Sequence, residues 1–268
     1  MRVIRLVTFD ITGTILKVKT TVGEQYSKVL HKFYNQTCDS YDLQISFADS
    51  YKNHLKKSPM FGIHNGITSK EWWGSVFIEA VLNSSSRSLC EGSVVPYQVK
   101  DGVEIWKTCK SPQAEQLQSA VDDIYWNFQW LPCHSVVETL QTVANLKRTQ
   151  DLTVGVISNN DERIFHTLKS SGIPMPFDFV ISSHNYGFEK PDPRIFHAAI
   201  EKVKELHRKD IHPSEMLHVG DSLEKDYFGA ISAGCNALLL DPTGQLNKEN
   251  QEHIISSLNQ VLKYFKQI

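Results

Sequence analysis

Asp10 is the first residue whose type and position point to chemistry. It ends an apolar, β-branched run, and Ile11, Thr12, Gly13 and Thr14 follow it. Ligands of open parallel sheets bind beyond the carboxyl ends of the strands, so a carboxylate there is well placed for catalysis or metal binding. Gly13 allows a sharp turn after the strand. Taken alone, the motif is equally typical of an aspartate that only caps a turn.

Polar residues also follow three later apolar runs. Ser158 ends the first of these, and its hydroxyl together with free backbone N–H groups can hold phosphate oxygens. Lys190 stands between glycine and proline turns, where it can balance the charge of a nucleophilic carboxylate. Asp221 follows the last run, with Asp226 five residues beyond it. Asp10 and Asp221 would supply the hard oxygen ligands that Mg²⁺ prefers.

Each of these later residues has an ordinary structural interpretation when it is considered by itself. Ser158 is then a strand-end hydroxyl and Lys190 a solvated loop charge, while Asp221 caps a helix and Asp226 is a surface acid. Coincidence explains poorly why all of them follow strands in a consistent order. The sequence therefore predicts that they converge on Asp10.

The elements that must position these residues alternate between strands and helices. Nearly continuous apolar runs, typical of strands buried on both faces, cover Val3–Phe9, Leu152–Ser158, Phe177–Ser183, Met216–Val219 and Ala237–Leu240. Helical patterns lie between the last four, and an amphipathic pattern predicts a C-terminal helix from Ile254 to Phe265. This alternation predicts an α/β fold with a parallel sheet covered on both faces.

The stretch from about Lys17 to Asn127 has helical patterns and loops but no convincing buried strand. Asp39–Tyr51 and Ser69–Leu82 are each expected to form a helix. The simplest organisation is a core domain made of residues 1–17 and 128–268. A helical domain of residues 18–127 is then inserted after the first strand.

The composition excludes several classes of protein. The 268 residues are 41% hydrophobic and 22% charged, with a formal net charge of −2, which favours neither nucleic acid nor a membrane surface as partner. The five cysteines are widely spaced and contain no CxxC, so neither a disulfide framework nor a structural zinc site is expected. With no apolar segment typical of a signal peptide, we expect an intracellular, cytoplasmic protein.

The ordered motifs resemble those of the haloacid dehalogenase (HAD) superfamily. They are Asp10-x-Thr12-Gly13-Thr14, Ser158, Lys190-Pro191, and Gly220-Asp221 with Asp226. Gly66–Trp73 and Lys190–Phe196 are similar to one group within it, the haloacid dehalogenase-like hydrolase domain-containing protein 3 group. The resemblance implies a Rossmann-like, doubly wound α/β core with an inserted all-helical cap domain.

The resemblance also implies the roles of the residues that handle phosphate. Asp10 would attack phosphorus in a small phosphorylated metabolite and become an aspartyl-phosphate. Ser158 and the Asn159 amide would hold the phosphoryl group, and Lys190 would neutralise its charge.

A magnesium site is implied in the same way. Asp10, Asp221 and the backbone carbonyl of Thr12 would bind Mg²⁺, and Asp226 would support these ligands from behind.

Thr12 departs from the pattern of the superfamily's phosphatases, which place a second aspartate at this position as general acid and base. A hydroxyl cannot replace that carboxyl, and general acid–base catalysis is worth roughly 10²–10⁴-fold in rate. Attack on phosphorus would survive this change, but turnover would be weakened. Glu24, His64 and Glu71 are candidates for a substitute base by location alone.

Three functions therefore remain open. The leading one is a Mg²⁺-dependent hydrolase of phosphatase type. The first alternative is a non-catalytic member that binds a phosphate ligand or a protein partner. The second is a dehalogenase-like or phosphonate-cleaving hydrolase, although Asp221 with Asp226 favours a Mg²⁺ site over a metal-free dehalogenase site.

Overall fold

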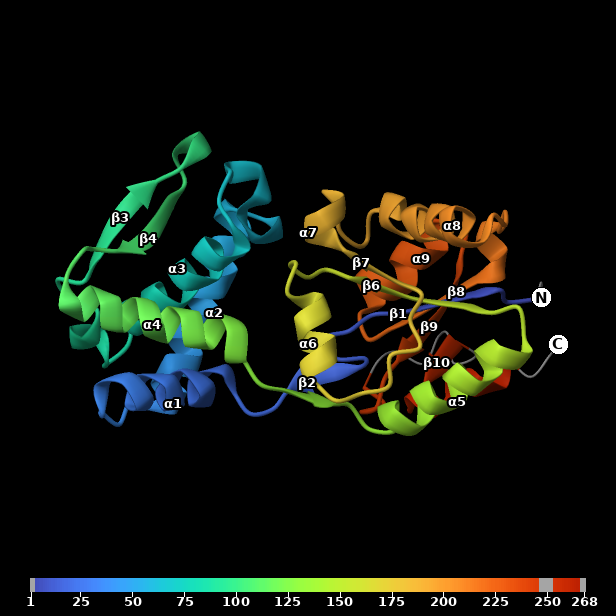
Figure 1. Ribbon diagram of the computed structural model, residues 1–268, viewed down its shortest axis with the longest axis horizontal. Helices are drawn as coiled ribbons and strands as arrows, with labels where there is room; N and C mark the ends of the chain where they lie inside the picture. The colour runs from blue at the N-terminus through green and yellow to red at the C-terminus, as the bar shows by residue number, and fades with distance from the viewer. Residues whose placement is uncertain (1–2, 246–252, 266–268) are drawn as a thin grey trace. The chain divides into compact units, whose positions relative to one another are not determined.

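The computed structural model describes residues 3–245 and 253–265 (Figure 1). The chain divides into two compact units, which we call the core unit and the inserted unit. The core unit comprises Met1–Lys17 and Trp130–Ile268, and the inserted unit comprises Val18–Gln129. Within the described residues, no helix is both long enough and apolar enough to cross a membrane.

The core unit is built on a six-stranded sheet in the order β10-β9-β8-β1-β6-β7, in which the paired strands run parallel. Its strands are β1 (Leu6–Phe9), β6 (Thr153–Ser158), β7 (Phe179–Ser182), β8 (Met216–Gly220), β9 (Asn236–Leu240) and β10 (Ile254–Ile255). Because β1 lies between β6 and β8, the carboxyl ends of these three strands meet at one edge of the sheet.

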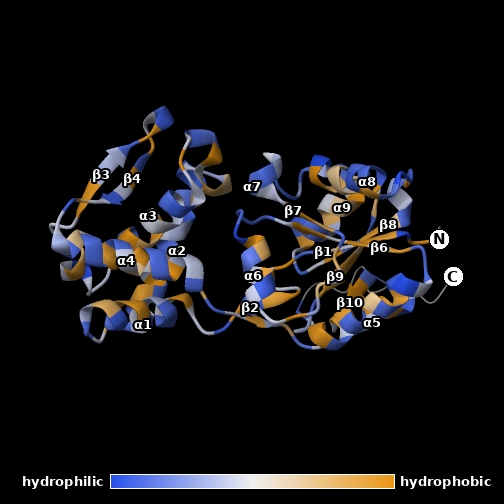
Figure 2. Ribbon diagram, in the orientation of Figure 1, coloured by the Kyte–Doolittle hydropathy of each residue, from blue (hydrophilic) through white to orange (hydrophobic). Residues whose placement is uncertain are grey.

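Helices of the core unit pack into two hydrophobic clusters, and residues along a strand join one cluster or the other. Val7 and Phe9 of β1 join the cluster that contains α5, whereas Leu6 joins the cluster that contains α8. The helices are α5 (Val136–Thr149), α6 (Ile164–Ser170), α7 (Ser183–Tyr186), α8 (Pro193–His207) and α9 (Gly229–Ser232). Burial on both faces explains the apolar strands in Figure 2 and confirms the predicted doubly wound sheet.

The predicted helix from Ile254 to Phe265 is wrong. Ile254–Ile255 forms β10 beside β9, and a 3₁₀ helix covers Leu258–Tyr264. The apolar residues that suggested the helix are indeed buried against the sheet. They recur mostly every three residues, at Ile255, Leu258 and Val261, and this spacing suits the tighter helix as well as an α-helix.

The inserted unit contains α1 (Val22–Tyr34), α2 (Ser40–Lys57), α3 (Ser69–Leu82) and α4 (Pro112–Asn127). Both helices expected within this stretch are thus present. A 3₁₀ segment, Met60–Asn65, lies between α2 and α3. β2 (Leu16–Val18) pairs with β5 (Trp130–Pro132), in the two chain segments that lead into and out of the inserted unit.

The inserted unit is not all-helical, which corrects the sequence-based prediction. β3 (Val94–Gln98) and β4 (Glu104–Thr108) form an antiparallel hairpin. Four of the five residues of β3 are exposed, and Pro96 stands in its middle. A strand of this kind lacks the continuous apolar run by which a buried strand is recognised in a sequence.

Candidate active site

Asp10 directly follows the central strand β1 and is 5% exposed. Its backbone N–H donates to the carbonyl of Val219 on β8, at 2.9 Å, so the parallel pairing of the two strands continues into the motif. The carbonyl of Ile11 accepts from three later N–H groups, including that of Leu16 at 2.8 Å, and this closes the turn. The sheet therefore fixes Asp10 before any side chain contributes.

Lys190 binds Asp10 directly, as the order of the motifs predicts. Its Nζ donates to Asp10 Oδ1 at 2.5 Å, to Asp226 Oδ1 at 2.6 Å and to the carbonyl of Ile157 at 2.9 Å. The side chain is 2% exposed. Since an ammonium has three hydrogens, all of them are used by protein acceptors. Lys190 is thus held against Asp10 and is not a solvated loop charge.

The Asn159 side chain fixes the loop that carries Lys190. Its Oδ1 accepts the Lys190 backbone N–H at 2.8 Å, and its Nδ2 donates to the Lys190 carbonyl at 2.8 Å. The sequence pointed only to the backbone amide of Asn159 and did not predict this pair of hydrogen bonds from its side chain. Ser158, just before it, is buried at the end of β6, the strand beside β1.

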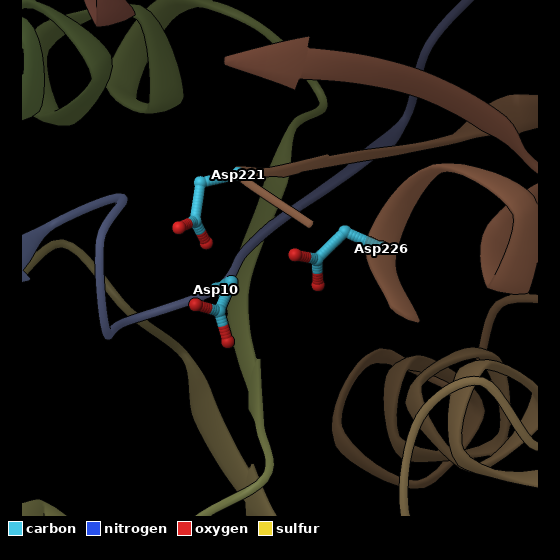
Figure 3. Close-up of side chains that lie close together, drawn as sticks. All are labelled: Asp10, Asp221 and Asp226. Carbon is cyan, nitrogen blue, oxygen red and sulfur yellow. The ribbon is translucent and has the colours of Figure 1, made fainter. Parts of the chain in front are cut away.

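Three carboxylates gather at this edge of the sheet (Figure 3). Asp10, Asp221 and Asp226 each offer an oxygen atom, and these atoms lie within 4.8 Å of one another. Asp226 is engaged by the protein: Oδ1 accepts from Lys190 and His218, and Oδ2 accepts the Ser222 N–H at 2.9 Å. Asp10 and Asp221 are therefore the better placed of the three to bind an ion directly.

Two glycines make room for these carboxylates. Gly13 has φ of +88°, and a Cβ on it would lie 2.1 Å from Asp221 Oδ2. A Cβ on Gly220 would lie 2.1 Å from Asp226 Cγ. Both distances are far below van der Waals contact, so a side chain at either position would displace the carboxylate.

Burial and mutual repulsion set the charges of the site. Burial raises the pKa of Asp10 to about 6 against the opposing effect of Lys190, and the Asp226 charge adds to the rise. Burial also raises the pKa of Asp221. Burial disfavours the charged form of Lys190, but Asp10 and Asp226 outweigh it and raise its pKa. Burial alone would raise the pKa of Asp226, but the charge of Lys190 opposes burial and the pKa is lowered. The resulting excess of carboxylates over ammonium suits a divalent cation.

Thr8 and His218 belong to the same network, and neither was predicted from the sequence as a site residue. They face each other in the pairing of β1 with β8, and Thr8 Oγ1 lies 2.8 Å from His218 Nδ1. His218 Nε2 lies 3.1 Å from Asp226 Oδ1. The sequence does hold a signal: each is a polar residue inside an apolar strand next to a motif aspartate. Thr12 itself is exposed, in the turn after β1.

Two of the residues considered as a substitute base have structural roles in the inserted unit. Glu24 and Glu71 each complete a capping box, accepting the backbone N–H of Thr21 at 3.0 Å and of Thr68 at 2.9 Å. Glu71 also pairs with Lys107 at 2.9 Å. These contacts account for both glutamates without catalysis.

Comparison with known proteins tests the resemblance to haloacid dehalogenase-like hydrolases. The family model of haloacid dehalogenase-like hydrolases matches residues 4–234. Haloacid dehalogenase-like hydrolase domain-containing protein 3 of Bos taurus is 29% identical over 264 residues, covering 97% of this chain and 92% of the bovine protein. The resemblance to that group is thus confirmed.

Solved structures share the fold over nearly the whole chain. The HAD hydrolase YfnB from Bacillus subtilis, bound to magnesium, has a TM-score of 0.64 at 15% identity, covering 99% of this chain and 100% of that chain. A HAD phosphatase from Thermococcus onnurineus has a TM-score of 0.57 at 21% identity, covering 97% of each chain. From its motifs, its fold and the matched family model, this chain belongs to the haloacid dehalogenase-like hydrolase family.

Proposed function

We propose that this hydrolase is a Mg²⁺-dependent phosphatase that acts on a small phosphorylated metabolite through an aspartyl-phosphate at Asp10. The observation that carries the proposal is the triple contact of Lys190, which holds one oxygen of Asp10 beside two further carboxylates. A carboxylate held in this way is oriented for attack and surrounded by the charges that a phosphoryl group requires.

The residues divide the work of the first step among them. The hydrogen bonds among the described residues engage Oδ1 of Asp10 and leave Oδ2 to attack phosphorus. As the Oδ2–phosphorus bond forms, the bond from phosphorus to the leaving oxygen breaks. The Ser158 hydroxyl and the Asn159 N–H would donate to the phosphoryl oxygens, while Lys190 offsets charge through Asp10.

The donor set fits Mg²⁺, which takes few carboxylates, with waters and substrate phosphate completing its coordination. Asp10, Asp221 and the Thr12 carbonyl would hold the ion, and Asp226 would support the site through Lys190 and the Ser222 N–H. When bound, Mg²⁺ supplies positive charge to the phosphoryl oxygens. The magnesium in the YfnB structure is consistent with this proposal.

The main test is trapping with beryllium fluoride, a mimic of the aspartyl-phosphate, followed by fluorine NMR. We expect an adduct that requires both Mg²⁺ and Asp10 and is absent from Asp10→Asn. If the wild-type protein binds no Mg²⁺ and forms no adduct, the catalytic proposal is wrong. Binding of inorganic phosphate without an adduct would instead favour a non-catalytic, ligand-binding member. Release of halide from a 2-haloacid without Mg²⁺ would favour a dehalogenase.

Thr12 offers no carboxyl to protonate the leaving group or to activate water, so we propose that turnover is slow. Thr12→Asp should raise hydrolysis of an aryl phosphate by about 10²-fold, the lower end of general acid–base effects. Thr12→Asn is the matched control, with the same shape and no ionisable group. An unchanged rate in a folded Thr12→Asp variant would mean that the missing carboxyl does not limit turnover.

We further propose a cytoplasmic location and a small-molecule partner, not nucleic acid or a membrane. The five cysteines are free, as expected in a reducing compartment. The formal net charge of −2 gives no general attraction to polyanions. Fractionation of cells that express a tagged chain tests the location.

A further inference from the structure

His218 is a fully buried polar residue for which the proposed reaction has no role. It lies on β8, where strand pairing sets it opposite Thr8, two residues before Asp10. The ring of Phe196 from α8 contacts it edge-on, with 5.2 Å between ring centroids. Its ring nitrogens lie 2.8 Å from Thr8 Oγ1 and 3.1 Å from Asp226 Oδ1. Such a residue requires a partner for each nitrogen.

The chemistry of these partners fixes the hydrogens of His218. An ionised Asp226 can only accept, so His218 Nε2 must carry the hydrogen that it donates. Burial lowers the pKa of His218 and favours the neutral ring. Nδ1 is then an acceptor, and the Thr8 hydroxyl must donate to it. Asp226 thereby selects the ring form, and Thr8 stabilises it by donating to Nδ1.

Asp226 passes this constraint to the catalytic residues. The oxygen that accepts from His218 is also the oxygen that accepts from Lys190 at 2.6 Å. The other oxygen is held by the Ser222 N–H, within the π-helix turn that begins after β8. Lys190 in turn holds Asp10. An unbroken series of buried hydrogen bonds therefore runs from Thr8 to the nucleophile.

We propose that His218, oriented by Thr8, is a positioning residue that holds Asp226, and through it Lys190, in register with Asp10. Its kinetic consequence rests on the proposed phosphatase activity, but the placement of Lys190 does not. His218→Leu removes the donor and keeps a similar volume, whereas His218→Gln restores an N–H donor. Val203→Ala is the matched control, because Val203 is buried in the hydrophobic cluster that contains Phe196 and lies outside the network.

The first experiment needs no substrate. Nitrogen-15 NMR of the full-length protein should show the hydrogen of His218 on Nε2 and none on Nδ1. It should also show a slowly exchanging ammonium signal from Lys190, assigned by its absence from Lys190→Met. That signal should disappear in His218→Leu and persist in His218→Gln and Val203→Ala. A hydrogen on Nδ1, or a Lys190 signal that survives in His218→Leu, would overturn the proposal.

The second experiment measures hydrolysis of an aryl phosphate with Mg²⁺. Loss of a group that orients catalytic residues typically costs about 10–100-fold in activity. We expect a loss of this size in kcat for His218→Leu, little change in KM, and recovery in His218→Gln. An equal loss in Val203→Ala would reduce His218 to a packing residue. A wild-type protein without activity would refute the proposed phosphatase, and the NMR result would still decide the role of His218.

Discussion

Each unit of this protein contains a buried histidine bonded to a hydroxyl and near a carboxylate, but only His218 is linked, through Asp226 and Lys190, to the proposed nucleophile. In the inserted unit, His54 of α2 binds Ser75 Oγ through Nε2 at 2.9 Å. Its Nδ1 lies 2.9 Å from the Ser50 carbonyl and 3.2 Å from Glu79 Oε2. The order serine, histidine, acid has the pattern of a hydrolase triad.

The difference lies in what each network leaves free. Ser75 is fully buried, and its Oγ also accepts the N–H of Trp106 at 2.8 Å, so the hydroxyl serves to join α2, α3 and β4. In the core unit, the equivalent bonds end on Asp10, which keeps one oxygen outside them. Residue types and distances therefore do not identify a catalytic group. A better criterion for a catalytic group is an atom that the fold holds in place without engaging it in a hydrogen bond.

Substitution of Asp10 and of Ser75 should separate the two networks most strongly. Asp10→Asn removes the proposed nucleophile and should lower aryl phosphate hydrolysis by roughly 10³-fold or more, because loss of a covalent nucleophile is among the largest single effects in enzymes. Ser75→Ala should change the rate by less than about threefold, since a group sealed in the fold makes no transition-state contact. Steady-state kinetics with Mg²⁺ measures both, and a large loss in a folded Ser75→Ala would contradict the comparison.

The loss of stability should also be larger for a substitution in the core network than for one in the network of the inserted unit. Lys190→Met leaves Asp10 and Asp226 buried without their cation, and breaking a buried pair costs about 3–5 kcal/mol. Ser75→Ala leaves neutral partners unsatisfied, at about 1–3 kcal/mol. Urea unfolding without Mg²⁺ gives both values. Lys204→Met, which removes an exposed ion pair with Asp210, is the control and should leave the midpoint nearly unchanged. An equal cost for Lys190→Met and Ser75→Ala would mean that the core network is not electrostatic.

Under the proposed function, magnesium affinity should fall in acid, because the ion and a proton would compete for Asp10. Burial raises the pKa of Asp10 to about 6, so its carboxylate is ionised above that pH and protonated below it. Below pH 6, the apparent affinity should drop by up to about tenfold per unit, as one proton must be displaced. Calorimetric titration at several pH values measures this. Asp210→Asn, which removes only an exposed ion pair with Lys204, should keep the same profile. An affinity that is flat from pH 5 to 7 would exclude Asp10 as a ligand.

The inserted unit should show a smaller pH dependence, again with a loss in acid, but in its stability and not in ion binding. Burial lowers the pKa of His54 below its ordinary value of 6.5, against Glu79 and with the help of Lys57. The neutral ring therefore contributes stability above pH 6.5, and this contribution is lost as pH falls through the lowered pKa. Four of the five tryptophans lie in this unit, so tryptophan fluorescence in urea follows its unfolding.

The matched variants for this effect are His54→Gln and His31→Gln. His54→Gln should flatten the acid slope, whereas His31→Gln, at an exposed site near the end of α1, should leave it unchanged. A slope that survives in His54→Gln would assign the acid sensitivity to other groups.

The sheet and the motif residues were predictable because both depend on local sequence. Strands buried on both faces show continuous apolar runs, and parallel strands must end at one edge, so Asp10, Ser158 and Asp221 could be placed together. The contacts of His218 and of the Asn159 side chain could not be predicted. They depend on strand register and on loop geometry, which only the assembled fold fixes.

Elements with weak apolar patterns were also missed. β3 is mostly exposed, and β10 has only two residues, so neither produces a run that can be recognised. The C-terminal pattern was read correctly as buried but assigned to the wrong helix, because a spacing of three residues fits both helix types.

At Gly13 and at Gly220, the addition of a single carbon atom would be enough to disrupt the active site. A methyl group at either position would take the space of a carboxylate, that of Asp221 or Asp226, while every acidic residue stayed in the sequence. A descendant with such a change would keep all its motif aspartates and still lose the geometry that they form. Loss of activity among relatives should therefore be sought at the glycines as much as at the acids.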